Sequence, residues 1–264
     1  MRIPLLVASF LVANPPAAQA AVITVTTTAE ELNVDGDCSL REAIAAANGD
    51  APVDACPAGS GVDTIVIPAG TYPIGLELAV TSDLTISGAA AATTIWDGGG
   101  SGRVLNIATA VTATVQGVTI TNGNGNGGGG IFNLGGLTVT NSTISGNVAT
   151  GDGGGIFNLG GLTVANSTIS GNNGGSFGLG GGGIFNQGNL TVTNSTISGN
   201  NAEGLGGGIL NFGVLTVTNS TIAGNVGDTG DGIFYAFSPP HPQPTRLRRT
   251  TTAWGGQSTT AATT

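Results

Sequence analysis

The stretch GGGIFNLGGLTVTNSTISGN, Gly128–Asn147, decides the fold because close copies of it follow along the chain. Its second part, residues 133–147, recurs with the same internal length as residues 158–172, 186–200 and 211–225. Glycine-rich gaps of unequal length separate the copies. Equal segments joined by variable gaps are typical of one supersecondary unit stacked on the next.

Each copy contains the pattern of short strands. Apolar and hydroxylic residues alternate with period two, as L-T-V-T and then S-T-I-S, which predicts half-buried strands. Asn and Gly stand at the corners between them, where they tolerate left-handed backbone. One copy is too short to bury its own core, so its strands are expected to pair in parallel and in register with those of the next copy. The predicted fold class is all-β, a parallel β-helix with one repeat per coil and about 4.8 Å between coils.

In such a stack, identical residues lie over one another. Asparagine amides can then bond from coil to coil, and isoleucines can pack into a continuous core. The predicted ladders are Asn133, Asn158, Asn186 and Asn211; Asn141, Asn166, Asn194 and Asn219; and, in the core, Ile131, Ile156, Ile184 and Ile209. The second set begins N-S-T triplets, which also read as glycosylation acceptors, but a spacing of about 5 Å disfavours four adjacent glycans.

The chain ends differ from the repeats. Residues 1–20 combine Arg2, an apolar run and a small-x-small end at Ala18–Ala20, which predicts a secretory signal cut after Ala20. The apolar run is too short to span a bilayer and no second run follows, so no transmembrane segment is expected in the mature chain. At the other end, residues 236–264 lose the alternation and are predicted to be a disordered tail, or an aberrant one caused by truncation or a frame shift.

The segment between signal and repeats is predicted to cap the stack. Ser39 with Glu42 three residues later forms a capping box, which predicts a short helix over residues 39–47 inside a cap of residues 21–62. The β-helix is then expected over residues 63–235. Cys38 and Cys56 are expected to form a disulfide in an exported chain, and this bond is expected to stabilise the folded chain by about 3 kcal/mol. Two free thiols are the alternative.

Charge limits the function. The formal net charge is −9, the pI is about 4.1, and all six basic residues are arginines, which argues against nucleic-acid binding. Between residues 125 and 230 the charged residues are Asp152, Glu203 and Asp228, in or beside the gaps, a poor basis for catalysis. Asp97 and Arg103 are the best enzymatic candidates.

Two further sets of residues invite a binding hypothesis. Asn33, Asp35 and Asp37 stand at alternate positions, as in a calcium loop, but a turn that enters the helix is the favoured explanation, and no other cofactor is expected. Outward threonines are expected in rank on successive coils, at Thr138, Thr163, Thr191 and Thr216. Such a rank can contact a glycan or ordered water, but solvent-facing strand positions are rich in Thr in any case.

Two stretches resemble a known family. DGDCSLREAIAAAN (35–48) and DACPAGSGVDTIVIPAGTY (54–72) are similar to the CSLREA domain at the start of exported bacterial β-helix proteins. The GGGIFN and NSTISGN copies resemble repeats of the polymorphic outer membrane protein type and of the pectate-lyase-like superfamily. The resemblance implies a right-handed solenoid on a secreted or surface-exposed bacterial protein.

We therefore predict a secreted or cell-surface β-helix protein that is not an enzyme and has a structural or adhesive role. Its expected partner is a carbohydrate or another surface protein. The alternative is a polysaccharide lyase or glycoside hydrolase that uses the same fold.

Overall fold

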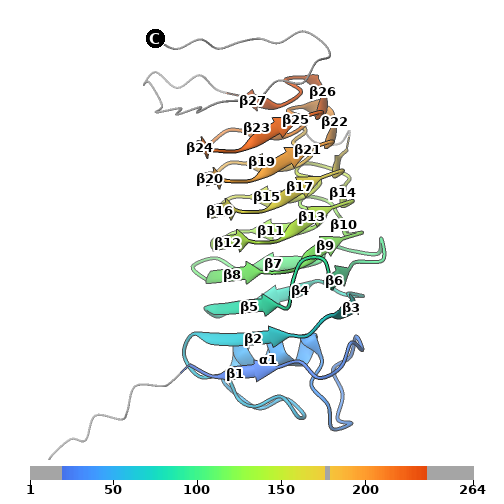
Figure 1. Ribbon diagram of the computed structural model, residues 1–264, viewed down its shortest axis with the longest axis vertical. Coiled ribbons are helices and arrows are strands. Elements are labelled where there is room, and N and C mark those ends of the chain that lie inside the picture. Colours follow the sequence, from blue (N-terminus) through green and yellow to red (C-terminus); the bar gives the residue numbers. More distant parts are fainter. Residues whose placement is uncertain (1–19, 176–178, 237–264) are drawn as a thin grey trace, which may run out of the picture.

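The computed structural model describes residues 20–175 and 179–236. These form one elongated stack of coils, with β1 and α1 at one end and β27 at the other (Figure 1). The predicted signal lies, apart from Ala20, outside the described residues, and so does the predicted tail apart from Ala236.

Four parallel sheets run along the stack. Sheet I consists of β1 (Val22–Thr24), β2 (Asp63–Ile67), β5 (Leu84–Gly88), β8 (Thr112–Gln116), β12 (Gly136–Thr140), β16 (Gly161–Ala165), β20 (Asn189–Thr193) and β24 (Val214–Thr218). Sheet II consists of β3 (Gly70–Pro73), β6 (Thr94–Asp97), β9 (Thr119–Thr121), β13 (Thr143–Ser145), β17 (Thr168–Ser170), β21 (Thr196–Ser198) and β25 (Thr221–Ala223).

The other two sheets complete each coil. Sheet III consists of β10 (Asn124–Gly125), β14 (Val148–Ala149), β18 (Asn173–Gly174), β22 (Asn201–Leu205) and β26 (Val226–Thr229). Sheet IV consists of β4 (Leu78–Val80), β7 (Leu105–Ile107), β11 (Ile131–Asn133), β15 (Ile156–Asn158), β19 (Ile184–Asn186), β23 (Ile209–Asn211) and β27 (Ile233–Tyr235). Sheets II and IV each hold seven strands, so seven coils stack, and the predicted all-β parallel β-helix is confirmed.

The core forms because like residues pair in register. In sheet IV, Ile131 pairs with Ile156, which pairs with Ile184 and so on to Ile209, and all four are fully buried. Along each strand, buried and more exposed residues alternate, as the period of two requires. Each buried Ile, Leu or Val removes apolar surface worth about 1.5–3 kcal/mol from water, and it does so against the neighbouring coils.

A helix closes the first end of the stack. Helix α1 (Leu40–Gly49) has Ser39 as its N-cap, and the predicted capping box with Glu42 is present. The helix runs two residues beyond the predicted end and packs against β1, β2 and β4. Cys38, just before the helix, forms a disulfide with Cys56, with 4.9 Å between the Cα atoms.

The cap also contributes a strand that the sequence analysis did not predict. β1 pairs in parallel with β2, with Val22 opposite Thr64. Sheet I therefore begins before residue 63, the predicted start of the β-helix. The partner strand lies about forty residues away in the chain, a separation that alternation within VITVT does not reveal.

Of the two predicted asparagine ladders, the first has the expected form. Asn133 donates its amide to Asn158 at 2.7 Å, Asn158 donates to Asn186 at 2.7 Å, and Asn186 donates to Asn211 at 2.6 Å. The four side chains are almost fully buried.

The second ladder needs a correction. The residues at the Asn141 corner are exposed and left-handed, with φ of 47–50°, and one amide link joins them, from Asn194 to Asn166 at 3.4 Å. The left-handed corner turns these side chains toward solvent. The buried second ladder is formed six residues later in each copy, by Asn147, Asn172, Asn200 and Asn225, with amide links of 3.0, 2.9 and 2.9 Å.

Candidate functional site

Sheet I presents a continuous rank of threonines to the outside. Each pairs in register with the next, so the predicted rank of four extends over seven coils. We call it the threonine face: Thr64, Thr85, Thr114, Thr138, Thr163, Thr191 and Thr216. All seven are partly or fully exposed, and none of their hydroxyls forms a hydrogen bond with another described residue. Each hydroxyl can therefore donate one hydrogen bond to a ligand and accept others from it.

A shallow depression adjoins this face at the corner between sheets I and II. Its volume is about 380 Å³, and its polar lining comes from Ser87, Gln116 and Asn141 beside the small residues 88–91. Gln116 donates to the Ser87 hydroxyl at 3.1 Å. The lining carries no charged side chain, so the depression suits a neutral polar ligand.

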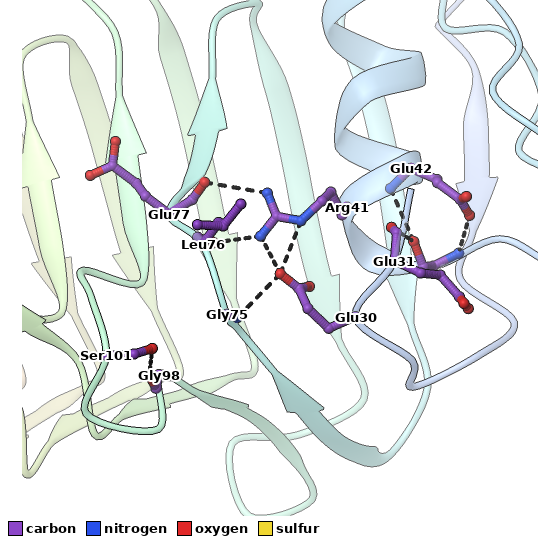
Figure 2. A network of polar contacts seen from close by, with 10 residues as sticks. Glu30, Glu31, Arg41, Glu42, Gly75, Leu76, Glu77, Gly98 and Ser101 are labelled. Carbon is purple, nitrogen blue, oxygen red and sulfur yellow. Dashed lines mark hydrogen bonds and ion pairs between the residues drawn. The ribbon is translucent and has the colours of Figure 1, made fainter. Parts of the chain in front are cut away.

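The second candidate site is a cluster of charges on the first coils, shown in part in Figure 2. Arg41 of α1 pairs with Glu30, and its guanidinium also donates to the backbone carbonyls of Leu76 and Glu77. Glu30 in turn accepts from the Gly75 backbone at 3.2 Å. Arg41 therefore ties the cap helix to the loop before β4.

Arg103 continues the cluster on the next coil. Its Nη1 lies 2.5 Å from Glu77 Oε2, and Asn106 donates to the other carboxylate oxygen at 2.8 Å. Nη2 donates to the Gly127 carbonyl at 2.8 Å, and the guanidinium carbon lies 4.5 Å from the ring centre of Phe132. Arg41 and Arg103 are the two cations among the described residues, and both contact Glu77, a relation that alternation in the sequence did not reveal.

The two predicted enzymatic candidates do not meet. Asp97, at the end of β6, accepts from the Asn122 amide and the Gly99 backbone, both at 2.9 Å. Arg103 takes Glu77 as its carboxylate partner instead. Glu77, which the sequence analysis did not single out, is the carboxylate that pairs with Arg103.

Phenylalanines continue from Arg103 along the outside of sheet IV. The rings of Phe132 and Phe157 are 5.1 Å apart and those of Phe157 and Phe185 are 4.6 Å apart, with nearly parallel planes. Phe212 follows at 5.4 Å with a tilted ring. Because each of the first three rings has a neighbour on both sides, with Arg103 over Phe132, the faces of Phe132, Phe157 and Phe185 are not open to stack on a sugar. This stack stabilises the coils.

The acids of the later coils have other surroundings. Asp152 accepts from the backbone of Leu179 and Gly180, so it links its own coil to the following one. Glu203 and Asp228 are exposed on β22 and β26, and neither forms an ion pair with a described residue.

The loop before α1 gathers three carboxylates. Glu31, Asp35 and Asp37 bring carboxylate oxygens within 4.8 Å of one another. Partial burial, then the charges of Asp35 and its neighbours, raise the pKa of Glu31 and the pKa of Asp37. Asp37 Oδ1 is buried and has no hydrogen-bond partner among the described residues. Asn33, the remaining residue of the predicted calcium set, donates its amide to Glu31 at 3.0 Å and therefore lies beside these carboxylates.

The family follows from one comparison. The family model of the right-handed beta helix region matches residues 77–241, more than half of the chain. The chain belongs to this family. Its coils are therefore right-handed, as the resemblance implied. No curated protein matches the chain. Among the described residues, no helix has the length and apolarity needed to cross a membrane.

Solved structures share this right-handed β-helix fold at low identity. Pectin methylesterase PemA from Erwinia chrysanthemi has a TM-score of 0.49 and 16% identity, covering 77% of this chain and 65% of its own. A pectin methylesterase in complex with a hexasaccharide has a TM-score of 0.47 and 14% identity, covering 83% and 66%. Pectate lyase Pel9A has a TM-score of 0.47 and 16% identity, covering 83% and 69%. The chain thus spans about two thirds of these solved chains.

These neighbours correct one prediction. The sequence analysis predicted that the chain is not an enzyme, but the solved structures that share its fold are a lyase and two esterases, so that prediction is wrong as it was made. At 14–16% identity the likeness shows the fold alone, and the neighbours assign no role to any residue of this chain.

Proposed function

We propose that this β-helix binds a neutral polysaccharide along its threonine face, as an exported protein that attaches to or acts on glycans. The observation that carries the proposal is the in-register rank of seven threonines with free hydroxyls. A linear glycan offers hydroxyl groups at regular intervals, and a parallel β-helix offers them about every 4.8 Å. Export is supported by the residues before Ala21 and by the disulfide.

Charge supports a neutral ligand over an acidic one. The chain carries a net charge of −9, which repels a polyanion, and the threonine face and the adjoining depression add no cation. The two described arginines are already bound to carboxylates and backbone carbonyls.

The test replaces hydroxyls without changing shape. In the triple variant Thr138→Val, Thr163→Val, Thr191→Val, three hydroxyls are lost from adjacent coils. The matched control makes the same change on sheet II, at Thr143, Thr168 and Thr196, which are also paired in register. At about 0.5–1.5 kcal/mol per hydrogen bond, the sheet I variant is expected to bind neutral polysaccharide at least tenfold more weakly.

Binding is measured by co-sedimentation with insoluble neutral and acidic polysaccharides. Equal loss in both variants, or binding to acidic polysaccharide alone, contradicts the proposal. Inhibition of ice growth without glycan binding would assign the face to ordered water instead.

The charge cluster favours a second candidate, chemical action on the polysaccharide. Glu30 lies beside the guanidinium group of Arg41 on the cap helix, and Glu77 lies beside that of Arg103 on the neighbouring coils. Glycoside hydrolysis uses two carboxylates, which these residues could supply. Both oxygens of Glu77 are engaged, by Arg103 and by Asn106. Release of reducing ends or unsaturated products by the wild type, lost in Glu77→Gln and kept in the threonine-face variant, supports this activity; no release contradicts it.

We also propose that the acidic loop before α1 takes a calcium ion. Three converging carboxylates and the unpartnered Asp37 Oδ1 are hard oxygen ligands, and a divalent cation offsets their mutual repulsion. Its role here is to order the cap, and the test is given in the Discussion.

A further inference from the structure

Asp63, the first residue of β2, is a fully buried carboxylate at the start of the stack. Its Oδ1 accepts from the backbone nitrogens of Ala21 at 3.0 Å and Ser60 at 2.8 Å. Its Oδ2 is buried without a partner among the described residues, and no described cation pairs with it. A buried carboxylate with one oxygen free of protein partners is costly to fold, and a positive charge beside it would offset that cost.

The fold brings Ala21 to Asp63 by backbone pairing. The Thr64 nitrogen donates to the Ala21 carbonyl at 2.8 Å, and Val22 pairs with Thr64 as β1 begins. Gly59 encloses the carboxylate, because a Cβ on that residue would lie 2.3 Å from Asp63 Oδ2. The Ala21 nitrogen is therefore held at the carboxylate by the sheet and not by its own side chain.

The same nitrogen lies at the junction that the sequence marks for cleavage. The small-x-small end at Ala18–Ala20 directs the cut to the bond between Ala20 and Ala21, and Ala20 is exposed. Hydrolysis adds water across this bond, so Ala20 leaves as a carboxylate and the Ala21 nitrogen becomes an ammonium after taking a proton from solvent. A cut at any neighbouring bond would place the new amine elsewhere.

We propose that removal of residues 1–20 creates a partly buried ion pair between the α-ammonium of Ala21 and the carboxylate of Asp63. The ammonium supplies a positive charge and two additional N–H donors. One of these donors can form a hydrogen bond with Asp63 Oδ2. Processing then adds an ion pair to the backbone pairing of β1 with β2, so that the cap is more stable in the mature chain than in the unprocessed one.

The composition makes the test selective. All six basic residues are arginines, so the α-amine of a chain that begins at Ala21 is its one primary amine, and an acetylating ester labels that group. In the folded chain, labelling is expected to be at least tenfold slower than in denaturant. Asp63→Asn removes the partner, and Asp83→Asn is the matched control, since Asp83 also accepts from a backbone nitrogen, that of Thr112.

Four samples complete the test. The wild type and the Asp63→Asn variant both begin at Ala21. Each protein is measured in two forms, one with a free α-amine and one whose α-amine was acetylated in the unfolded state before refolding. Acetylation is expected to lower the melting temperature of the wild type by about 3–8 °C and to have little effect on that of the variant. The exported full-length chain is expected to begin at Ala21 by mass spectrometry. A different N-terminus, or equally fast labelling in the folded and denatured wild type, overturns the proposal even where Asp63→Asn does not fold.

Discussion

The side-chain amide of Asn133 donates to the side-chain oxygen of Asn158 at 2.7 Å, although the two residues lie on different coils. The same amide also reaches the carbonyls of Gly135 and Gly161. Each asparagine thus satisfies its own turn and the next one, which explains why the copies keep this residue at a fully buried position.

Replacing the central member of this ladder tests that explanation. Asn158→Ala leaves the Asn133 amide and the Asn186 oxygen without their side-chain partners in a buried site. We expect a loss of about 2–5 kcal/mol, since each orphaned group costs about 1–3 kcal/mol. Asn189→Ala, at an exposed position of β20, is the matched control and is expected to change little. Urea unfolding measures both, and equal stabilities would rule out the ladder as a source of stability.

Two neighbouring glycines give a sharper contrast. A Cβ on Gly160 would lie 2.0 Å from the carbonyl oxygen of Gly135 on the preceding coil, whereas a Cβ on Gly161 meets nothing within 4 Å. Gly160→Ala is therefore expected to cost more than about 3 kcal/mol or to prevent folding, because backbone cannot move aside without breaking the coil register. Gly161→Ala is expected to be neutral or slightly stabilising. Thermal unfolding of the two variants tests this prediction, and similar melting temperatures would contradict the close contact between the coils.

The core could be predicted from the repeat, but the features that depart from the repeat could not. Ile131 and Asn133 recur at fixed offsets in every copy, so stacking in register fixed their neighbours without further information. Asn141 and Asn147 look equivalent in the sequence, and only the left-handed backbone at Asn141 separates the exposed corner from the buried ladder.

Contacts between distant residues of the cap and the first coils could not be predicted from the repeat pattern. Glu77 meets Arg103, and Ala21 meets Asp63, across separations that no period connects. Isolated charges gave no hint of their partners, because ion pairing depends on which coils stack and where each loop leaves its sheet.

The pair formed by Arg103 and Glu77 is expected to depend on the shape of the guanidinium. Arg103→Lys keeps the charge but cannot bind Glu77 and the Gly127 carbonyl together while lying flat on Phe132. We expect a loss of about 1–2 kcal/mol, modest because both side chains are partly exposed.

A double-mutant cycle with Glu77→Gln separates the ion pair from the other contacts of Arg103. A coupling energy above about 0.5 kcal/mol in thermal or urea unfolding is the expected outcome. If the two substitutions have additive effects on stability, the Glu77 carboxylate is not coupled to Arg103 and is available for another role at this site.

For the acidic loop, we predict how the stability of the Asp37→Asn variant compares with that of the wild type at different pH values and with calcium. Partial burial and neighbouring carboxylates raise the pKa of Asp37 in the folded cap, so folding favours its protonated form. The contribution of this group to stability is therefore present below the ordinary carboxyl pKa, near 4, and is lost as the pH rises through the raised value. Without calcium, Asp37→Asn is expected to be at least as stable as the wild type at pH 7, and the difference is expected to vanish as the pH falls below about 4.

Calcium is expected to reverse that order. Millimolar calcium should raise the melting temperature of the wild type at pH 7 and leave that of Asp37→Asn nearly unchanged, because the variant lacks one of the three converging carboxylates. Asp50→Asn is the matched control, since Asp50 is the left-handed C-cap of α1, a conformation that Asn tolerates, and stands outside the cluster. Calorimetric titration measures the binding directly. Equal calcium responses in all three proteins would show that the carboxylates of this loop repel one another without holding an ion.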